Sequence, residues 1–182
     1  MNKIFILPES KVFYMKKNVK TLSQEFQIKE GDLAPDFNFK DPDNENLRLS
    51  NFLGKRVVIY FYPRDFTPGC TTEADEFSIQ FHKYSENEIV IIGISPDDEK
   101  THQKFKDKMK IPFLLASDTN SQISQKYWVS NLKKIMGKES IVVNRTTFLI
   151  DKDGKIVKIF RKVKPKGHSA TVLDYFLKYN NS

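Results

Sequence analysis

The 182-residue sequence contains a single cysteine, so no disulfide can form within it. Disulfides persist mainly in oxidising compartments, and a chain with one thiol therefore fits a reducing environment. The sequence also lacks any apolar run near the roughly 20 residues that a membrane-spanning helix needs. Its longest apolar runs are at 57–62 and 89–94. We therefore expect a soluble protein that does not enter a membrane and lies inside the cell, in the cytoplasm, with a nuclear or organellar location as the alternative.

The N-terminus lacks the pattern of a secretory signal. The apolar segment 3–7 is shorter than the apolar part of such a signal, and Pro8 and Glu9 follow it at once. We assign residues 1–29 to an N-terminal extension, which could be a tail, an extra strand or a targeting segment. Residues 30–182 have the length and apolar content of one domain.

The chain is basic, with 30 lysines and arginines against 23 acidic residues and a net charge of +7. Such a charge could attract nucleic acid or an anionic membrane surface. However, the lysines alternate with acidic residues, as they do at 100–110, which is typical of a solvated helix face. Only 161–166 resembles a basic localisation patch, so neither nucleic acid nor membrane is an expected partner.

Strand-like and helix-like segments alternate along the chain. Because 57–62 and 89–94 show no polar alternation, they are predicted to be strands covered on both faces. Amphipathic spacing predicts helices at 70–84, 97–110, 120–128 and 170–179. Shorter strands are predicted at 37–40, 47–49, 113–116, 146–150 and 156–160, the last two joined by a hairpin turn at Asp153-Gly154. This order predicts an α/β fold with a mixed central sheet flanked by helices.

Cys70 lies where the first core strand is predicted to end and a helix to begin. The free backbone N–H groups and the positive end of the helix dipole stabilise an anion at such a position. This placement favours the thiolate, which is the nucleophilic form of cysteine. A free cysteine is often no more than a small buried apolar residue, so the position by itself leaves both interpretations open.

The residues around Cys70 resemble the peroxidatic signature P-x-x-x-T-x-x-C of the peroxiredoxins. Pro63, Thr67 and Cys70 occupy its fixed positions, and Glu73 occupies the usual acidic position one turn later. The run TPGCTTEA is similar to the bacterioferritin-comigratory, or peroxiredoxin Q, branch of that family. Further similar segments follow in order at 31–37, 91–97, 145–156 and 163–168. The resemblance extends to about residue 179 and implies a thioredoxin-like α/β fold.

The resemblance implies a thiol-dependent peroxidase that reduces hydrogen peroxide and organic hydroperoxides. Cys70 would be the peroxidatic nucleophile, and the Thr67 hydroxyl would orient the peroxide. The guanidinium of Arg145 would stabilise both the thiolate and the leaving oxygen. Pro63 would cover the pocket and exclude water, and Glu73 would hold an arginine in place.

One departure from the branch concerns the resolving cysteine, which many members carry five residues after the peroxidatic one. This chain has Asp75 at that position and no other thiol. A sulfenic acid at Cys70 would therefore need an external thiol reductant such as thioredoxin, glutaredoxin or glutathione. No cofactor or metal is expected, because the three histidines are dispersed along the chain. We expect a monomer or a weak homodimer.

A different class of function remains as the alternative, namely a thioredoxin-fold binding module whose single thiol senses redox state. One form of this alternative is a nuclear protein associated with nucleic acid. Thr67 and Arg145 distinguish the two, because a pure binding module would not need both side chains beside Cys70.

Overall fold

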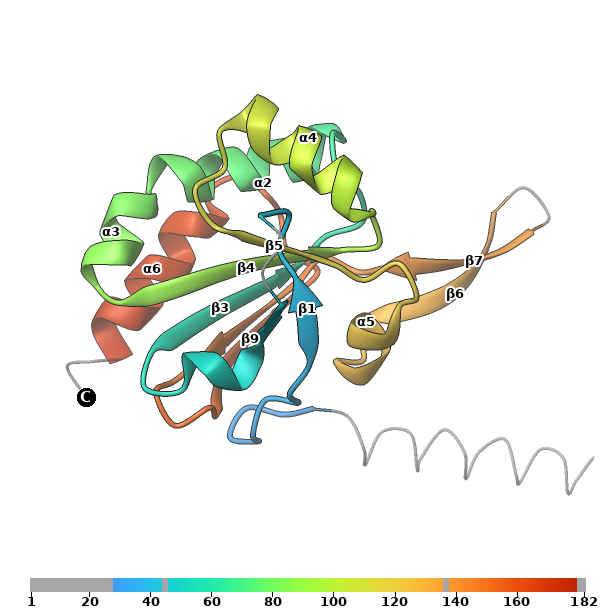
Figure 1. Cartoon of the computed structure of the whole chain (residues 1–182). Coiled ribbons are helices and arrows are strands. Elements are labelled where there is room, and N and C mark those ends of the chain that lie inside the picture. The colour runs from blue at the N-terminus through green and yellow to red at the C-terminus, as the bar shows by residue number, and fades with distance from the viewer. Residues whose placement is uncertain (1–27, 44–45, 136–137, 180–182) are drawn as a thin grey trace, which may run out of the picture.

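The computed structural model describes residues 28–43, 46–135 and 138–179. Its centre is a five-stranded mixed sheet in the order β5-β4-β3-β8-β9 (Figure 1). The strands β3 (Arg56–Phe61), β4 (Ile89–Ser95) and β5 (Leu114–Ser117) run parallel to one another. In contrast, β8 (Thr146–Ile150) is antiparallel to β3, and β9 (Ile156–Arg161) is antiparallel to β8. The predicted mixed sheet is thus confirmed.

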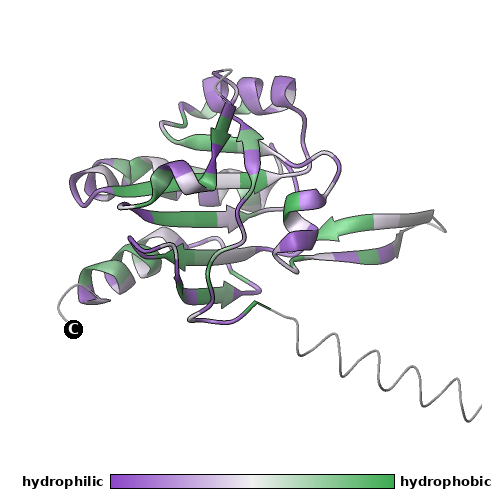
Figure 2. Cartoon of the chain, turned by 60° about the horizontal axis from the view of Figure 1, so that its bottom comes forward, coloured by the Kyte–Doolittle hydropathy of each residue, from purple (hydrophilic) through white to green (hydrophobic). Residues whose placement is uncertain are grey.

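The central strand β3 is buried along its whole length. Successive side chains of a strand point to opposite faces of the sheet. Accordingly Ile59 and Phe61 belong to one apolar cluster, whereas Val58 and Tyr60 belong to another on the opposite face. Figure 2 shows the hydrophobic colour along the central strands. Because both faces are covered, the strand has no polar alternation, as the sequence predicts.

Helices cover one face of the sheet (Figure 1). They are α2 (Pro68–Ile79), α3 (Phe81–Glu86), α4 (Glu99–Met109) and α6 (His168–Tyr179). The single helix predicted at 70–84 is in fact two helices, because the backbone at Gln80 has φ −95° and ψ 2° and ends α2 there. Phe77 and Tyr84 nevertheless remain in one apolar cluster, so the predicted buried stripe continues across the break.

The opposite face is covered by shorter elements and by the beginning of the described chain. These elements are β1 (Asn38–Lys40), β2 (Asn46–Arg48), the 3-10 helix η1 (Leu49–Phe52) and α5 (Gln122–Lys126). Ile28 lies within the predicted N-terminal extension, yet it is part of this core. Residues 1–27 of that extension lie outside the described residues.

A hairpin of β6 (Ser130–Ile135) and β7 (Lys138–Val143) was not predicted from the sequence. It projects from the body of the protein (Figure 1). Leu132 and Ile141 face each other across the hairpin but are both exposed, so these apolar residues do not mark a buried face that the sequence could reveal. The hairpin predicted between β8 and β9 is confirmed, with Gly154 at φ +80° in its turn. Within the described segments, no helix is long and apolar enough to cross a membrane.

Two buried tyrosines of the helical face provide a test of this packing. The hydroxyl of Tyr60 has no hydrogen-bond partner among the described residues, whereas the hydroxyl of Tyr84 donates to the carbonyl of Ser169 at 2.6 Å. A buried polar group without a partner costs free energy. We expect Tyr60→Phe to leave the free energy of unfolding unchanged or to raise it, and Tyr84→Phe to lower it by about 1 kcal/mol, in urea unfolding. A large loss in Tyr60→Phe alone would contradict this assignment.

Candidate active site

Cys70 is the third residue of α2, which follows directly on the loop after β3. Pro68 is the first residue of the helix. Proline has no backbone N–H, and this costs no helix hydrogen bond here because first-turn N–H groups have no intrahelical acceptor. The thiol therefore lies at the start of a helix, as the sequence predicts. It is also buried, with a relative exposure of 1%.

The hydroxyl of Thr67 contacts the thiol directly. Thr67 is the N-cap residue of α2, but its side chain does not cap the helix backbone. Instead its Oγ1 lies 2.9 Å from Sγ of Cys70 and 3.1 Å from the carbonyl oxygen of Arg64. The hydroxyl is thus held beside the sulfur rather than on the backbone N–H groups that an N-cap threonine usually binds.

Arg145, the residue directly before β8, contacts the same sulfur. Its Nη2 donates to Sγ of Cys70 at 3.2 Å, and its Nη1 donates to Oε2 of Glu73. Glu73 is fully buried on α2, one turn after Cys70. A Cβ atom on Gly69 would lie only 3.3 Å from Nη2, so glycine at this position leaves room for the guanidinium. Side chains from two distant parts of the sequence therefore meet at the thiol.

Burial and charge act in opposite directions on this ion pair. Burial raises the pKa of Glu73 to about 7, although the guanidinium of Arg145 pulls that pKa down. Burial lowers the pKa of Arg145, but Glu73 and Cys70 raise it by more, and the net pKa lies above the ordinary value of arginine. The guanidinium thus stays positively charged beside the sulfur.

The two remaining positions singled out in the sequence are exposed. Pro63 lies at the surface, at the start of the loop between β3 and α2. Asp75, which occupies the position of a possible resolving cysteine, is also exposed on α2. In the described parts of the chain, no group of three or more histidine, cysteine, aspartate or glutamate side chains is arranged to hold a metal ion.

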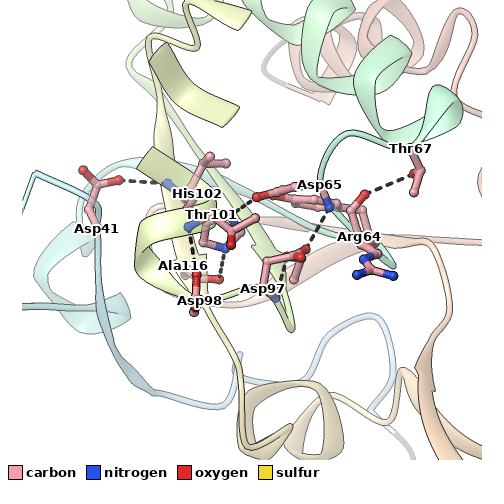
Figure 3. A network of polar contacts seen from close by, with 12 residues as sticks. Asp41, Arg64, Asp65, Thr67, Asp97, Asp98, Thr101, His102 and Ala116 are labelled. Carbon is pink, nitrogen blue, oxygen red and sulfur yellow. Dashed lines mark hydrogen bonds and ion pairs between the residues drawn. The ribbon is translucent and has the colours of Figure 1, made fainter. Parts of the chain in front are cut away.

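A polar network beneath the loop was not predicted (Figure 3). Asp65 is buried and bonds to both Tyr62 and His102, and its backbone N–H donates to Asp97. The sequence predicted Asp97 to begin a helix, but α4 begins at Glu99. The signal that could have revealed this network is Asp65 itself, an acidic residue inside the thiol motif, in the loop that follows a buried strand.

His168 is a second buried histidine near the site. Its Nε2 lies 2.8 Å from the hydroxyl of Thr147, and it begins α6. Burial lowers the pKa of His168 to about 4, and the charge of Arg145 lowers it further in the same direction. The imidazole is therefore neutral at neutral pH.

Comparison with known proteins agrees with this geometry. Residues 31–159 match the model of the AhpC/TSA family. This chain belongs to the AhpC/TSA family. It is 47% identical to peroxiredoxin Bcp of Bacillus subtilis over 146 residues, which cover 80% of this chain and 93% of that protein.

Solved structures of peroxiredoxins have the same fold. The bacterioferritin comigratory protein of Xanthomonas campestris, described for its alkyl peroxide reduction activity, superposes with a TM-score of 0.74 at 32% identity over 79% of this chain and 91% of its own. BcpB of Mycobacterium tuberculosis superposes with a TM-score of 0.75 at 30% identity, covering 84% and 98% of the two chains. The predicted thioredoxin-like fold and family are confirmed. The chain is a peroxiredoxin, a thiol-dependent peroxidase, and the alternative of a binding module is not favoured.

The buried neutral His168 predicts a pH dependence of stability. The pKa of His168 is about 4 in the folded protein and about 6.5 in the unfolded chain. The contribution of this difference to the free energy of unfolding is therefore complete above pH 6.5 and is lost as the pH falls towards 4. When the pH falls from 7 to 4.5, the free energy of unfolding should decrease by about 2 kcal/mol less in His168→Gln than in the wild type, because the variant has no imidazole to protonate on unfolding. Urea unfolding at the two pH values measures both decreases. His82→Gln, at an exposed position, is the matched control. Equal losses in wild type and His168→Gln would contradict a buried neutral imidazole.

Proposed function

We propose that Cys70 is the peroxidatic nucleophile of this peroxidase and that Thr67 and Arg145 are its catalytic partners. The observation that carries this proposal is the convergence of a hydroxyl and a guanidinium on one buried sulfur, which lies 2.9 Å from Oγ1 of Thr67 and 3.2 Å from Nη2 of Arg145. The contact from Arg145 stabilises negative charge on Sγ, because hydrogen bonds to a charged acceptor are stronger than those between neutral groups.

The reaction is a displacement at oxygen. The thiolate of Cys70 attacks one oxygen of the peroxide, so that an S–O bond forms and the O–O bond breaks. Sulfur is oxidised to sulfenic acid, and the other oxygen leaves as hydroxide or alkoxide and takes a proton from solvent. The substrates are hydrogen peroxide and organic hydroperoxides, in line with the alkyl peroxide reduction described for the Xanthomonas campestris relative.

Each partner has a separate task in this step. The hydroxyl of Thr67 accepts a hydrogen bond from the peroxide O–H and orients it toward the sulfur. The guanidinium of Arg145 stabilises charge as it moves from sulfur to the leaving oxygen. Glu73 holds that guanidinium in place from its buried position on α2. Pro63, with no N–H group of its own, helps to keep water from the site.

Return of the enzyme to the thiol requires an external reductant. Cys70 is the only cysteine in the sequence, so the sulfenic acid has no partner thiol within it. A first external thiol forms a mixed disulfide with Cys70 and releases water, and a second thiol reduces that disulfide and restores the Cys70 thiol. Thioredoxin, glutaredoxin and glutathione are the candidate donors.

The domain assignment, location and assembly are also proposals. Residues 1–29 are an extension before the peroxidase domain at 30–182. The start of the family match at residue 31 supports this division. We propose that the protein acts in the cytoplasm, because a chain with one thiol and no disulfide suits a reducing compartment. It acts as a monomer or a weak homodimer.

Arg145 is tested by its effect on the rate of Cys70 oxidation. Arg145→Ala should slow the reaction with hydrogen peroxide at least tenfold, which corresponds to about 1.4 kcal/mol of lost transition-state stabilisation. Arg145→Lys should recover only part of the rate, because an ammonium cannot contact Sγ and Glu73 with the same donor geometry. Stopped-flow kinetics measure both rates. A wild-type rate in a folded Arg145→Ala protein would remove Arg145 from the reaction.

The external-reductant mechanism is tested by intact mass spectrometry. Stepwise peroxide without a reductant should add one and then two oxygens to the chain, because no internal thiol competes for the sulfenic acid. Added glutathione should divert the first product to a mixed disulfide. Cys70→Ser is the control, and it should show neither product and no peroxide turnover. Complete conversion to a covalent dimer under mild peroxide would show that a second copy's Cys70 is the resolving thiol.

A further inference from the structure

One peptide unit in the active-site loop is held from both sides. The backbone N–H of Asp65 donates to Oδ2 of Asp97 at 2.8 Å. The carbonyl of Arg64, which belongs to the same peptide unit, accepts a hydrogen bond from Oγ1 of Thr67 at 3.1 Å (Figure 3). Because a peptide unit is planar and stiff, the direction of its N–H determines the direction of its carbonyl. The Asp97 carboxylate therefore controls where the acceptor for the Thr67 hydroxyl points.

The hydroxyl of Thr67 has one hydrogen and two neighbours that can accept it, the Arg64 carbonyl and Sγ of Cys70. When the hydrogen goes to the carbonyl, Oγ1 turns a lone pair rather than the hydrogen toward Sγ, so it can accept a hydrogen bond from a peroxide at the sulfur. If the carbonyl turned away, the hydrogen could go only to sulfur or to solvent. The carbonyl of Arg64 thus selects the form of the hydroxyl that can bind the substrate.

We propose that Asp97 is a positioning residue for peroxide reduction, which acts through the peptide unit between Arg64 and Asp65 on the hydroxyl of Thr67. This inference rests on the function proposed above for Thr67. Asp97 does not contact Cys70 in any interaction of the described structure, so its effect on the reaction is indirect.

The Asp97 carboxylate is itself anchored to the central sheet. The hydroxyl of Ser95 donates to Oδ2 of Asp97 at 2.7 Å and accepts from the Asp97 backbone N–H at 3.1 Å. Ser95 is the last residue of β4 and has a relative exposure of 1%. The loop that carries Thr67 is thereby tied to the rigid edge of the parallel strands.

The side chain of Asp65 also keeps the peptide unit between Arg64 and Asp65 from rotating, because it is itself held by two hydrogen-bond partners. Its Oδ1 accepts from the hydroxyl of Tyr62 at 2.7 Å, and its Oδ2 lies 2.8 Å from Nδ1 of His102. The next residue, Phe66, has φ +58°, which is uncommon for a residue with a bulky side chain. Such a conformation persists only where neighbouring contacts impose it, so these bonds maintain the loop in a shape that it would not adopt alone.

Helix capping does not explain the placement of Asp97. The N-cap of α4 is Asp98, whose carboxylate accepts from the backbone N–H of Thr101 at 2.8 Å. Asp97 and Asp98 are adjacent carboxylates with separate tasks, since one bonds to the active-site loop and the other to the helix. Asp98 therefore provides a matched control.

The test compares second-order rates of Cys70 oxidation by hydrogen peroxide, measured by stopped flow on the full chain. We expect Asp97→Ala to slow oxidation about tenfold. Asp97→Asn should stay within about threefold of the wild type, because its amide oxygen can still accept from the Asp65 N–H. Asp98→Ala should reduce the unfolding temperature without changing the rate more than twofold. Ser95→Ala, a milder change to the same anchor, should slow oxidation about threefold and serves if Asp97→Ala does not fold.

A double-mutant cycle separates positioning from general loss of structure. Thr67→Val should slow oxidation at least tenfold, and adding Asp97→Ala or Ser95→Ala to it should cause little further loss. Independent effects that multiply in the double variant, or a wild-type rate in both Asp97→Ala and Ser95→Ala, would overturn the positioning role and leave the proposed function of Thr67 intact. A wild-type rate in Thr67→Val would overturn the proposed role of Thr67 and the inference with it.

Discussion

The bridge that Arg145 makes between Glu73 and Cys70 is the interaction on which the site depends. It joins the start of α2 to the residue before β8, two segments that are far apart in the sequence. The partly buried guanidinium and the fully buried carboxylate each lose hydration, and each is tolerated because the other is present. The same pairing leaves one guanidinium nitrogen free to reach the sulfur, so an interaction needed for packing also supplies the positive charge that a thiolate needs.

The central strand β3 allows this bridge to form. It pairs with β4 on one side and with β8 on the other, so the loop that follows β3 lies next to the residues that precede β8. The site is therefore assembled where a parallel and an antiparallel neighbour meet on one strand. The polar contacts of Asp65 and Asp97 then connect the loop to β4 and α4. The loop before the thiol is therefore held in place by both a strand and a helix.

Elements with a strong apolar pattern were predicted well, and those without one were not. The strands at 57–62 and 89–94 were predicted to within one residue at either end, because burial on both faces leaves a continuous apolar run. In contrast, Leu132 and Ile141 of the β6–β7 hairpin are both exposed, so these apolar residues do not mark a buried face. The break at Gln80 was missed for a related reason, since the buried stripe continues from Phe77 to Tyr84 across it.

By itself, the sequence determined the fold class, the family and the position of Cys70 at a helix start, because these follow from local patterns and from a motif of fixed spacing. The proximity of Arg145 to that thiol was an expectation that came from the resemblance, and only the pairing of β3 with β8 brings the two together. Likewise, only the tertiary structure placed Asp97 on the active-site loop rather than on its helix. A carboxylate can bond to any nearby N–H group, and the sheet rather than the local sequence decides which group is near.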